Sequence, residues 1–152
     1  METLKFVNGY MRQKIERCDW RIIVINGDAF RAVFEIAARA VESGMTSQEG
    51  IKEHNEGLPE KERFLIRIGI HLGDVIEEAD GIKGDVVNIA ARIQAIAPGG
   101  GIAISATVSE SVRHNVPIDV VSLGAHMLNT TQDPYTVYTL TQHVTEPAFP
   151  PA

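Results

Sequence analysis

The chain has 152 residues, a length typical of one domain, with enough apolar side chains to bury a core. Its formal net charge of −6 argues against a nucleic-acid-binding protein, because such proteins hold phosphates on a basic face. The single cysteine, Cys18, excludes an internal disulfide and a cysteine-based metal cluster. The sequence shows no signal-peptide pattern and no apolar run long enough for a membrane segment, so we expect a cytoplasmic protein.

The amino-terminal half of the chain predicts a helix, a hairpin and a second helix. Residues 1–17 are weakly patterned and predict the first helix, whereas residues 20–34 alternate around an Asn-Gly turn, a strong hairpin signal. Asp28 is therefore expected at a hairpin tip, where an aspartate often does no more than satisfy turn amides. Residues 35–55 predict the second helix, which Gly44 and Gly50 would break or loosen toward its end.

Residues 64–77 carry β-branched side chains on either side of a Leu-Gly-Asp turn, which predicts two antiparallel strands joined by a short loop. His71 and Asp74 lie close together here and could form a catalytic pair. We prefer a structural interpretation, in which His71 is a hydrogen-bonded residue of a half-buried sheet and Asp74 is a turn residue. Residues 77–83 are expected to form a loop.

The stretch that follows predicts a helix with two different faces. Its apolar residues recur at helical spacing, namely Val86, Ile89, Ala90, Ile93 and Ala97. Asn88 and Arg92 stand four residues apart on the opposite side, so the helix holds this polar pair at a fixed separation. A Pro-Gly-rich break, a short strand over residues 102–104, a helix over 105–112 capped by Ser105, and strands over 118–123 and 135–140 complete the pattern.

These motifs together resemble the second half of class III adenylate/guanylate cyclase catalytic domains. The resemblance is strongest in IRIGIHLGDV and in GDVVNIAARIQAIAPGGGIAIS, where the family's Asn-x-x-x-Arg pair is matched by Asn88 and Arg92. Residues 21–34 look like the family's metal-carrying hairpin, and residues 123–124 with 134–140 are similar to its closing strands. The resemblance covers about residues 11–142.

The resemblance implies an α+β fold, the ferredoxin-like α/β sandwich of the nucleotide cyclases. It places the cyclase-homology domain in residues 1–142, followed by a Pro-rich, disordered tail over residues 143–152. It also implies that the domain is truncated at its amino end, without the family's first strand and the metal-binding aspartate on it. The hairpin over 21–34 is expected to join the sheet that holds strand 66–70, with Asp28 near the same sheet edge as Asn88 and Arg92.

The function that the resemblance implies is cyclisation of ATP to 3′,5′-cyclic AMP and pyrophosphate by two-metal catalysis at a dimer interface. Asp28 would bind Mg²⁺ or Mn²⁺, Asn88 would orient the ribose hydroxyl, and Arg92 would stabilise charge that develops on the α-phosphate. The expected partners are a nucleoside triphosphate, with ATP favoured, and a second cyclase domain in a homodimer or heterodimer.

Two positions depart from the pattern of the adenine-specific members of the family. Val24 stands where those enzymes carry Lys, and Gly81 stands where they carry Asp or Thr, with Asp80 one residue away. The departures leave two hypotheses open. The chain is either a cyclase domain that is impaired when alone, slow and more tolerant of Mn²⁺ than of Mg²⁺, or a degenerate, non-catalytic module for dimerisation and regulation in signalling.

Overall fold

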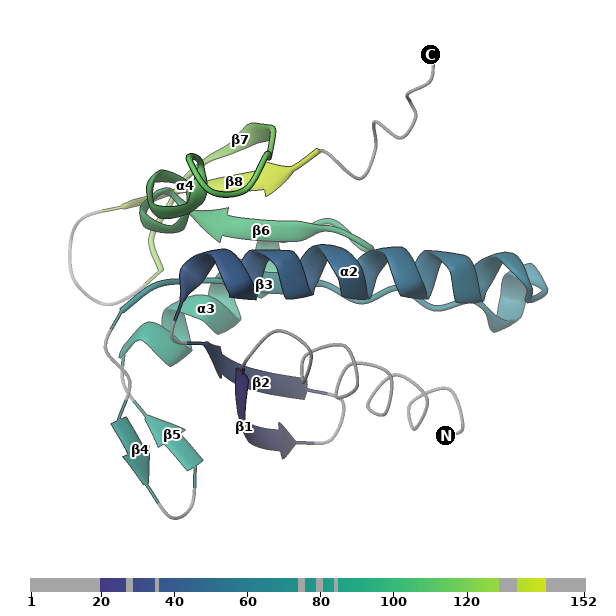
Figure 1. The fold of residues 1–152 in the computed structure, drawn as a ribbon, viewed down its shortest axis with the longest axis horizontal. Coiled ribbons are helices and arrows are strands. Elements are labelled where there is room, and N and C mark those ends of the chain that lie inside the picture. The colour runs from purple at the N-terminus through teal and green to yellow at the C-terminus, as the bar shows by residue number, and fades with distance from the viewer. Residues whose placement is uncertain are drawn as a thin grey trace.

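The computed structural model describes residues 20–26, 29–34, 36–73, 76–78, 81–83, 85–128 and 134–141 of the chain. The helix expected over residues 1–17 and the tail expected over residues 143–152 lie outside these ranges. The described elements, all but η1 labelled in Figure 1, are β1 (Trp20–Asn26), β2 (Ala29–Phe34), α2 (Ala37–Glu56), the 3₁₀ turn η1 (Glu60–Glu62), β3 (Ile68–Ile70), β4 (Ile76–Glu78), β5 (Gly81–Lys83), α3 (Asp85–Ile96), β6 (Ile102–Ser105), α4 (Ala106–Val112), β7 (Val120–His126) and β8 (Tyr135–Leu140).

A four-stranded mixed sheet in the order β3-β6-β8-β7 forms the centre of the fold (Figure 1). Strand β3 runs parallel to β6, whereas the β6–β8 and β8–β7 pairs are antiparallel. Parallel neighbours need a long crossover, which the chain makes through the segment that contains α3. This α+β sandwich confirms the predicted fold class. The loss of a first strand stays a prediction.

Alternate residues of β6 point to opposite faces of the sheet, and both faces carry apolar residues. Helices therefore cover both faces. One face carries the α2–α4 cluster, whose buried members are Val41, Ile102, Ile104, Val108, Val112, Val116 and Leu140. The other face carries the α3 cluster, whose buried members are Ile89, Ile93, Ala97, Ala103, Leu128 and Val137. Every member of the two clusters is at most 3% exposed, so each face has a dry apolar core.

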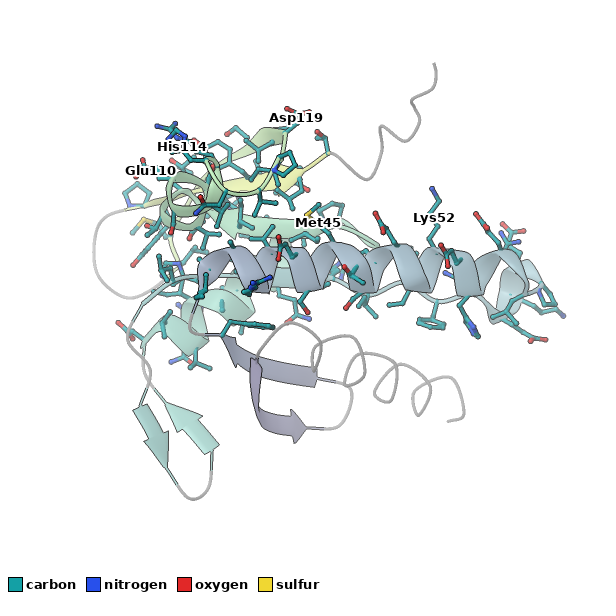
Figure 2. The ribbon with its side chains drawn as sticks, viewed as in Figure 1. Met45, Lys52, Glu110, His114 and Asp119 are labelled. Atoms are coloured by element: carbon teal, nitrogen blue, oxygen red, sulfur yellow. The ribbon has the colours of Figure 1, made fainter. Side chains whose placement is uncertain are left out.

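Helix α2 is continuous from Ala37 to Glu56, so the expected break near its glycines is wrong. Gly44 lies over the sheet, where an added Cβ would stand 3.3 Å from Ile102 Cδ1. The missing side chain thus allows close packing that offsets the low helix propensity of glycine. Met45 packs beside the α2–α4 cluster, whereas Lys52, farther along the helix, is exposed to solvent (Figure 2).

Two side chains of α2 bind backbone groups of the segments that precede β3 and β6. The Gln48 amide donates to the carbonyl oxygens of Ile66 and Gly101, at 3.2 and 2.9 Å. The Asn55 amide donates to the Phe64 carbonyl at 2.7 Å and accepts from the Phe64 N–H at 3.2 Å. The Ile66 and Gly101 carbonyls also accept from the Gly100 and Ile68 N–H groups, so the Gln48 amide adds a second bond to each. Together these side-chain bonds tie the second half of α2 to the segments that lead into β3 and β6.

The hairpin expected over residues 20–34 is confirmed, because β1 and β2 pair antiparallel with Asn26 opposite Ala29. The expectation that it joins the sheet of residues 66–70 is wrong for the described residues. There, β1 and β2 form a separate two-stranded sheet, with β2 beside α2 and β1 beside β5 (Figure 1). The turn residue Asp28 lies outside the described ranges, so its place relative to α3 stays a prediction.

The antiparallel pair expected over residues 64–77 is also wrong. Strand β3 pairs with β6, and the expected loop over residues 77–83 contributes to a second two-stranded sheet in which β4 pairs with β5. A run of β-branched residues fits a parallel buried strand as well as a hairpin arm, and here the crossover through α3 decides between them. None of the helices in the described part of the chain has the length and apolar character needed to span a bilayer.

Candidate active site on helix α3

Helix α3 presents a buried face to the sheet and a polar face to solvent, as the sequence predicts. Val86, Ile89 and Ile93 are buried, whereas Asn88 and Arg92 are exposed. Residues four apart on a helix are neighbours, with Cβ atoms about 6 Å apart. The rigid backbone therefore holds an amide and a guanidinium side by side, both accessible to a ligand from the same direction.

The position of α3 is set by its unusually close approach to β3. An added Cβ at Gly69 would lie 2.3 Å from the backbone nitrogen of Gln94 and 2.7 Å from the Ala90 carbonyl oxygen. No side chain fits in that space, so the helix backbone rests directly on the strand. The contact with β3 therefore fixes the distance of α3 from the sheet. It also fixes the position of Asn88 and Arg92 relative to the sheet.

Arg92 has a partner that the sequence did not indicate. Its Nη1 donates a hydrogen bond to the backbone carbonyl of Leu128, two residues beyond the end of β7. A backbone acceptor has no residue-type signature, so no sequence signal could have identified it. The bond uses one of the five N–H donors of a guanidinium, and the remaining donors are available to an anion.

A second polar group links β3 to β6 and α4. His71 Nδ1 lies 2.9 Å from Ser105 Oγ, and the imidazole meets the Tyr135 ring edge-on with centroids 5.7 Å apart. Ser105 is fully buried and caps α4 by accepting a bond from the Val108 N–H, which confirms the predicted cap. Burial lowers the pKa of His71 below its ordinary value, and the side chain is a hydrogen-bonded residue of the sheet, as expected.

The other predicted site residues lie on the two small sheets or outside the described ranges. Val24 lies in β1 opposite Arg31, and Gly81 begins β5 opposite Glu78. Because β1 lies beside β5 and β5 beside α3, the structure brings the strands of both positions to one side of the Asn88–Arg92 helix. Asp28, Asp80 and Asp74 fall outside the described residues.

The described residues do not by themselves form a metal site. Among them, no three His, Cys, Asp or Glu side chains gather in a way that could hold an ion. The predicted metal ligand Asp28 is not one of them. What the described site offers is a hydrogen-bonding amide and an anion-binding guanidinium, which suit a phosphorylated, hydroxyl-bearing ligand.

Comparison with known proteins gives a family for this arrangement. The model of the adenylate and guanylate cyclase catalytic domain matches residues 1–142. A putative adenylate cyclase 3 of Rhizobium meliloti is 36% identical over 119 residues, which are 78% of this chain and 20% of that protein. The chain therefore spans about a fifth of the length of that relative.

Solved cyclase structures share the fold. An adenylate/guanylate cyclase/hydrolase from Silicibacter pomeroyi superposes with a TM-score of 0.80 at 31% identity, covering 86% of this chain and 77% of that one. The non-canonical dimeric guanylyl cyclase domain of a fusion protein from the aquatic fungus Blastocladiella emersonii superposes with a TM-score of 0.71 at 21% identity, covering 92% of this chain and 82% of that one. At that lower identity the likeness concerns the fold alone.

Proposed function

The chain belongs to the class III adenylate and guanylate cyclase catalytic domains, and from this premise we propose that it cyclises ATP to 3′,5′-cyclic AMP and pyrophosphate. The observation that carries the proposal is the exposed Asn88–Arg92 pair on α3, held by the close contact with Gly69 and by the Leu128 carbonyl. The 36% identical relative, itself a putative adenylate cyclase, favours ATP over GTP. The domain is taken to comprise residues 1–142, followed by a tail.

In this proposal, the two residues of α3 have different tasks. Asn88 hydrogen-bonds the ribose and orients its 3′-hydroxyl toward the α-phosphate, which raises the rate by positioning. Arg92 donates to the α-phosphate oxygens, where negative charge increases as the bond to pyrophosphate breaks. A guanidinium suits the second task because its planar donors match two phosphate oxygens at once and it stays charged at every physiological pH.

The proposal includes a second cyclase domain and a divalent cation. The exposed face of α3 would form part of a site completed by another copy of this chain or by a related domain. Mg²⁺ or Mn²⁺ would bind at Asp28 and help to neutralise the triphosphate. The described residues hold no His, Cys, Asp or Glu cluster for the cation, so Asp28 is the ligand that the proposal assigns.

The test is an assay of cyclic nucleotide formation by the purified chain, with ATP or GTP and with Mn²⁺ or Mg²⁺. Because Asp28 is the one metal-binding carboxylate identified where the family's pattern has two, we expect slow formation of cyclic AMP that is faster with Mn²⁺. Loss of the guanidinium in Arg92→Ala should lower kcat about 100-fold, the typical effect of removing one transition-state donor. Asn88→Ala should also lower kcat.

Gln94→Ala is the matched control, because Gln94 is exposed on the same helix but stands outside the proposed pair. It should retain the parental rate. Cyclic GMP as the main product would correct the choice of substrate. If no cyclic nucleotide forms with either substrate or cation, while light scattering shows a dimer, the alternative of a non-catalytic dimerisation module replaces the proposal.

A further inference from the structure

Helix α3 and the end of β7 are joined by two contacts that come from a single residue, Leu128. Its side chain is 2% exposed and belongs to the α3 cluster, which also contains Ile89 and Ile93 of the buried face of α3. Its carbonyl oxygen accepts the hydrogen bond from Arg92 Nη1. One residue therefore contacts both the buried and the exposed face of the helix.

Strand β7 is shaped so that Leu128 turns inward. The β7–β8 pairing shifts register between Ser122 and Ala125, and Gly124 within the shift has φ +93°. Such a bulge bends a strand and redirects the residues that follow it. The outcome is visible in neighbouring side chains, because Met127 is 57% exposed and Leu128 is 2% exposed.

We propose that Leu128 is a positioning residue for Arg92, since its buried side chain anchors a backbone carbonyl that sets the direction of the guanidinium. An arginine side chain on a solvent-facing helix has many rotamers, and ordering it at the moment of reaction would cost conformational entropy. A carbonyl fixed by an apolar anchor removes that cost beforehand. The bond occupies Nη1 and leaves other donors for a phosphate.

The inference rests on the proposed function for its effect on catalysis, but the anchoring itself is testable without activity. Uniformly ¹⁵N-labelled chain allows the guanidinium of Arg92 to be followed by NMR, with Arg92→Lys identifying its signals. A guanidinium held at Nη1 rotates slowly about the Cζ–Nη1 bond and gives resolved Nη signals, whereas an unrestrained one gives an averaged signal. We expect resolved signals in the parental chain and averaged signals in Leu128→Ala.

Three variants separate positioning from a general loss of stability. Met127→Ala changes the exposed neighbour and should leave the Arg92 signals resolved. Val112→Ala shortens a fully buried side chain of the α2–α4 cluster, so it destabilises the fold without touching α3 and should also leave them resolved. Leu128→Met conserves the apolar volume and should restore the parental behaviour that Leu128→Ala loses.

Steady-state kinetics show whether Leu128→Ala changes kcat or KM. Leu128→Ala should lower kcat about tenfold with little change in KM, because misplacing a catalytic group costs transition-state stabilisation rather than ground-state binding. In the Arg92→Ala background the same substitution should have no further effect. Averaged Arg92 signals in the parental chain, or a kcat loss in Leu128→Ala no larger than in Val112→Ala, would overturn the proposal. Resolved signals in a parental chain that forms no cyclic nucleotide would leave Leu128 as the anchor and refute the proposed function instead.

Discussion

The two faces of the central sheet are packed by different means. On the α2–α4 face, β6 contributes the large side chains Ile102 and Ile104, and helices α2 and α4 meet them through branched residues. On the α3 face, β6 contributes Ala103 and β3 contributes Gly69, so the helix backbone comes down onto the strands. On the first face, large side chains separate the helices from β6, whereas on the second the small residues of β3 and β6 let the backbone of α3 approach closely.

This difference explains why the polar pair is on α3. A helix that rests on side chains can shift as they change rotamer, whereas a helix whose backbone contacts a strand has little freedom to move. The α3 face therefore buries less apolar volume, and so has less of the stabilisation that such burial provides. In return, Asn88 and Arg92 are held at a fixed distance from the sheet. The opposite face, which holds no predicted site residue among those described, supplies bulky apolar packing instead.

The largest effect expected from this comparison is that of a single methyl group at Gly69. Gly69→Ala places a Cβ against the backbone of Gln94 and Ala90, which cannot rotate away, so α3 must move. We expect the free energy of unfolding to fall by about 3 kcal/mol or more, at the upper end of overpacking effects. Urea denaturation measures it.

Gly57→Ala is the control for that substitution. The nearest atom to an added Cβ at Gly57 is the His54 carbonyl oxygen at 3.8 Å, an ordinary contact distance. This variant should unfold within about 0.5 kcal/mol of the parental chain. If Gly69→Ala behaved in the same way, α3 would not be held by backbone contact and the comparison of the two faces would fail.

The next largest effect comes from truncating one large side chain on each face. Ile104 and Ile93 are both fully buried, the first in the α2–α4 cluster and the second in the α3 cluster. Substitution of either by Ala should cost about 3 kcal/mol of unfolding free energy. Only Ile93→Ala should also loosen the Arg92 guanidinium, as read by its NMR signals. An equal loosening in Ile104→Ala would show that the two faces are not independent.

Much of α3 could be predicted from the sequence, because helical periodicity separates Ile89 and Ile93 from Asn88 and Arg92 without any knowledge of the partner surface. The Ser105 cap was predictable for a similar reason, since one side chain and the next turn's N–H define it locally. The β1–β2 hairpin followed from its Asn-Gly turn, again a local signal.

Apart from the local β4–β5 pair, which was expected to be a loop, the errors concern contacts between segments far apart in the chain. Whether β3 pairs with its sequence neighbour or with β6 depends on the crossover through α3, which periodicity does not reveal. Gly44 looked like a weak point of α2 because its packing partner Ile102 comes from β6. The Leu128 carbonyl escaped notice because every residue carries one. Long-range packing therefore decided what local propensity could not.

A smaller effect is expected at Ser105, where the two faces meet. This buried hydroxyl accepts from the Val108 N–H at the start of α4 and lies 2.9 Å from His71 Nδ1. Ser105→Ala removes the cap and leaves two polar groups without that partner, so we expect a loss of about 2 kcal/mol in unfolding free energy. Ser111→Ala, at an exposed position of the same helix, should change it by less than about 0.5 kcal/mol. Equal effects of the two substitutions would mean that Ser105 does not link the faces.

The smallest expected effect is the pH dependence that His71 adds to stability. Burial lowers the pKa of His71 in the folded chain below the ordinary value of 6.5, which the unfolded chain retains. As the pH falls, the unfolded chain therefore binds the proton first. The contribution of neutral His71 to the unfolding free energy is complete above about pH 6.5 and declines as the pH falls through the folded-state pKa. Among the described residues, the imidazole contacts the Ser105 hydroxyl and the Tyr135 ring, neither of which is a carboxylate that would favour the charged form.

Denaturation between pH 7.5 and pH 5 tests this sign, with the slope limited to about 1.4 kcal/mol per pH unit for one proton. His71→Gln keeps a hydrogen-bonding group toward Ser105 and cannot titrate, so its stability should fall less steeply than that of the parental chain over this range. His114→Gln, at an exposed position after α4, should keep the parental slope. If the stability of His71→Gln changed with pH as steeply as that of the parental chain, the imidazole would have the same pKa in the folded and the unfolded chain. The α3 side of the sheet would then be open to water at the end of β3, and the contrast with the dry α2–α4 face would be greater than the packing alone indicates.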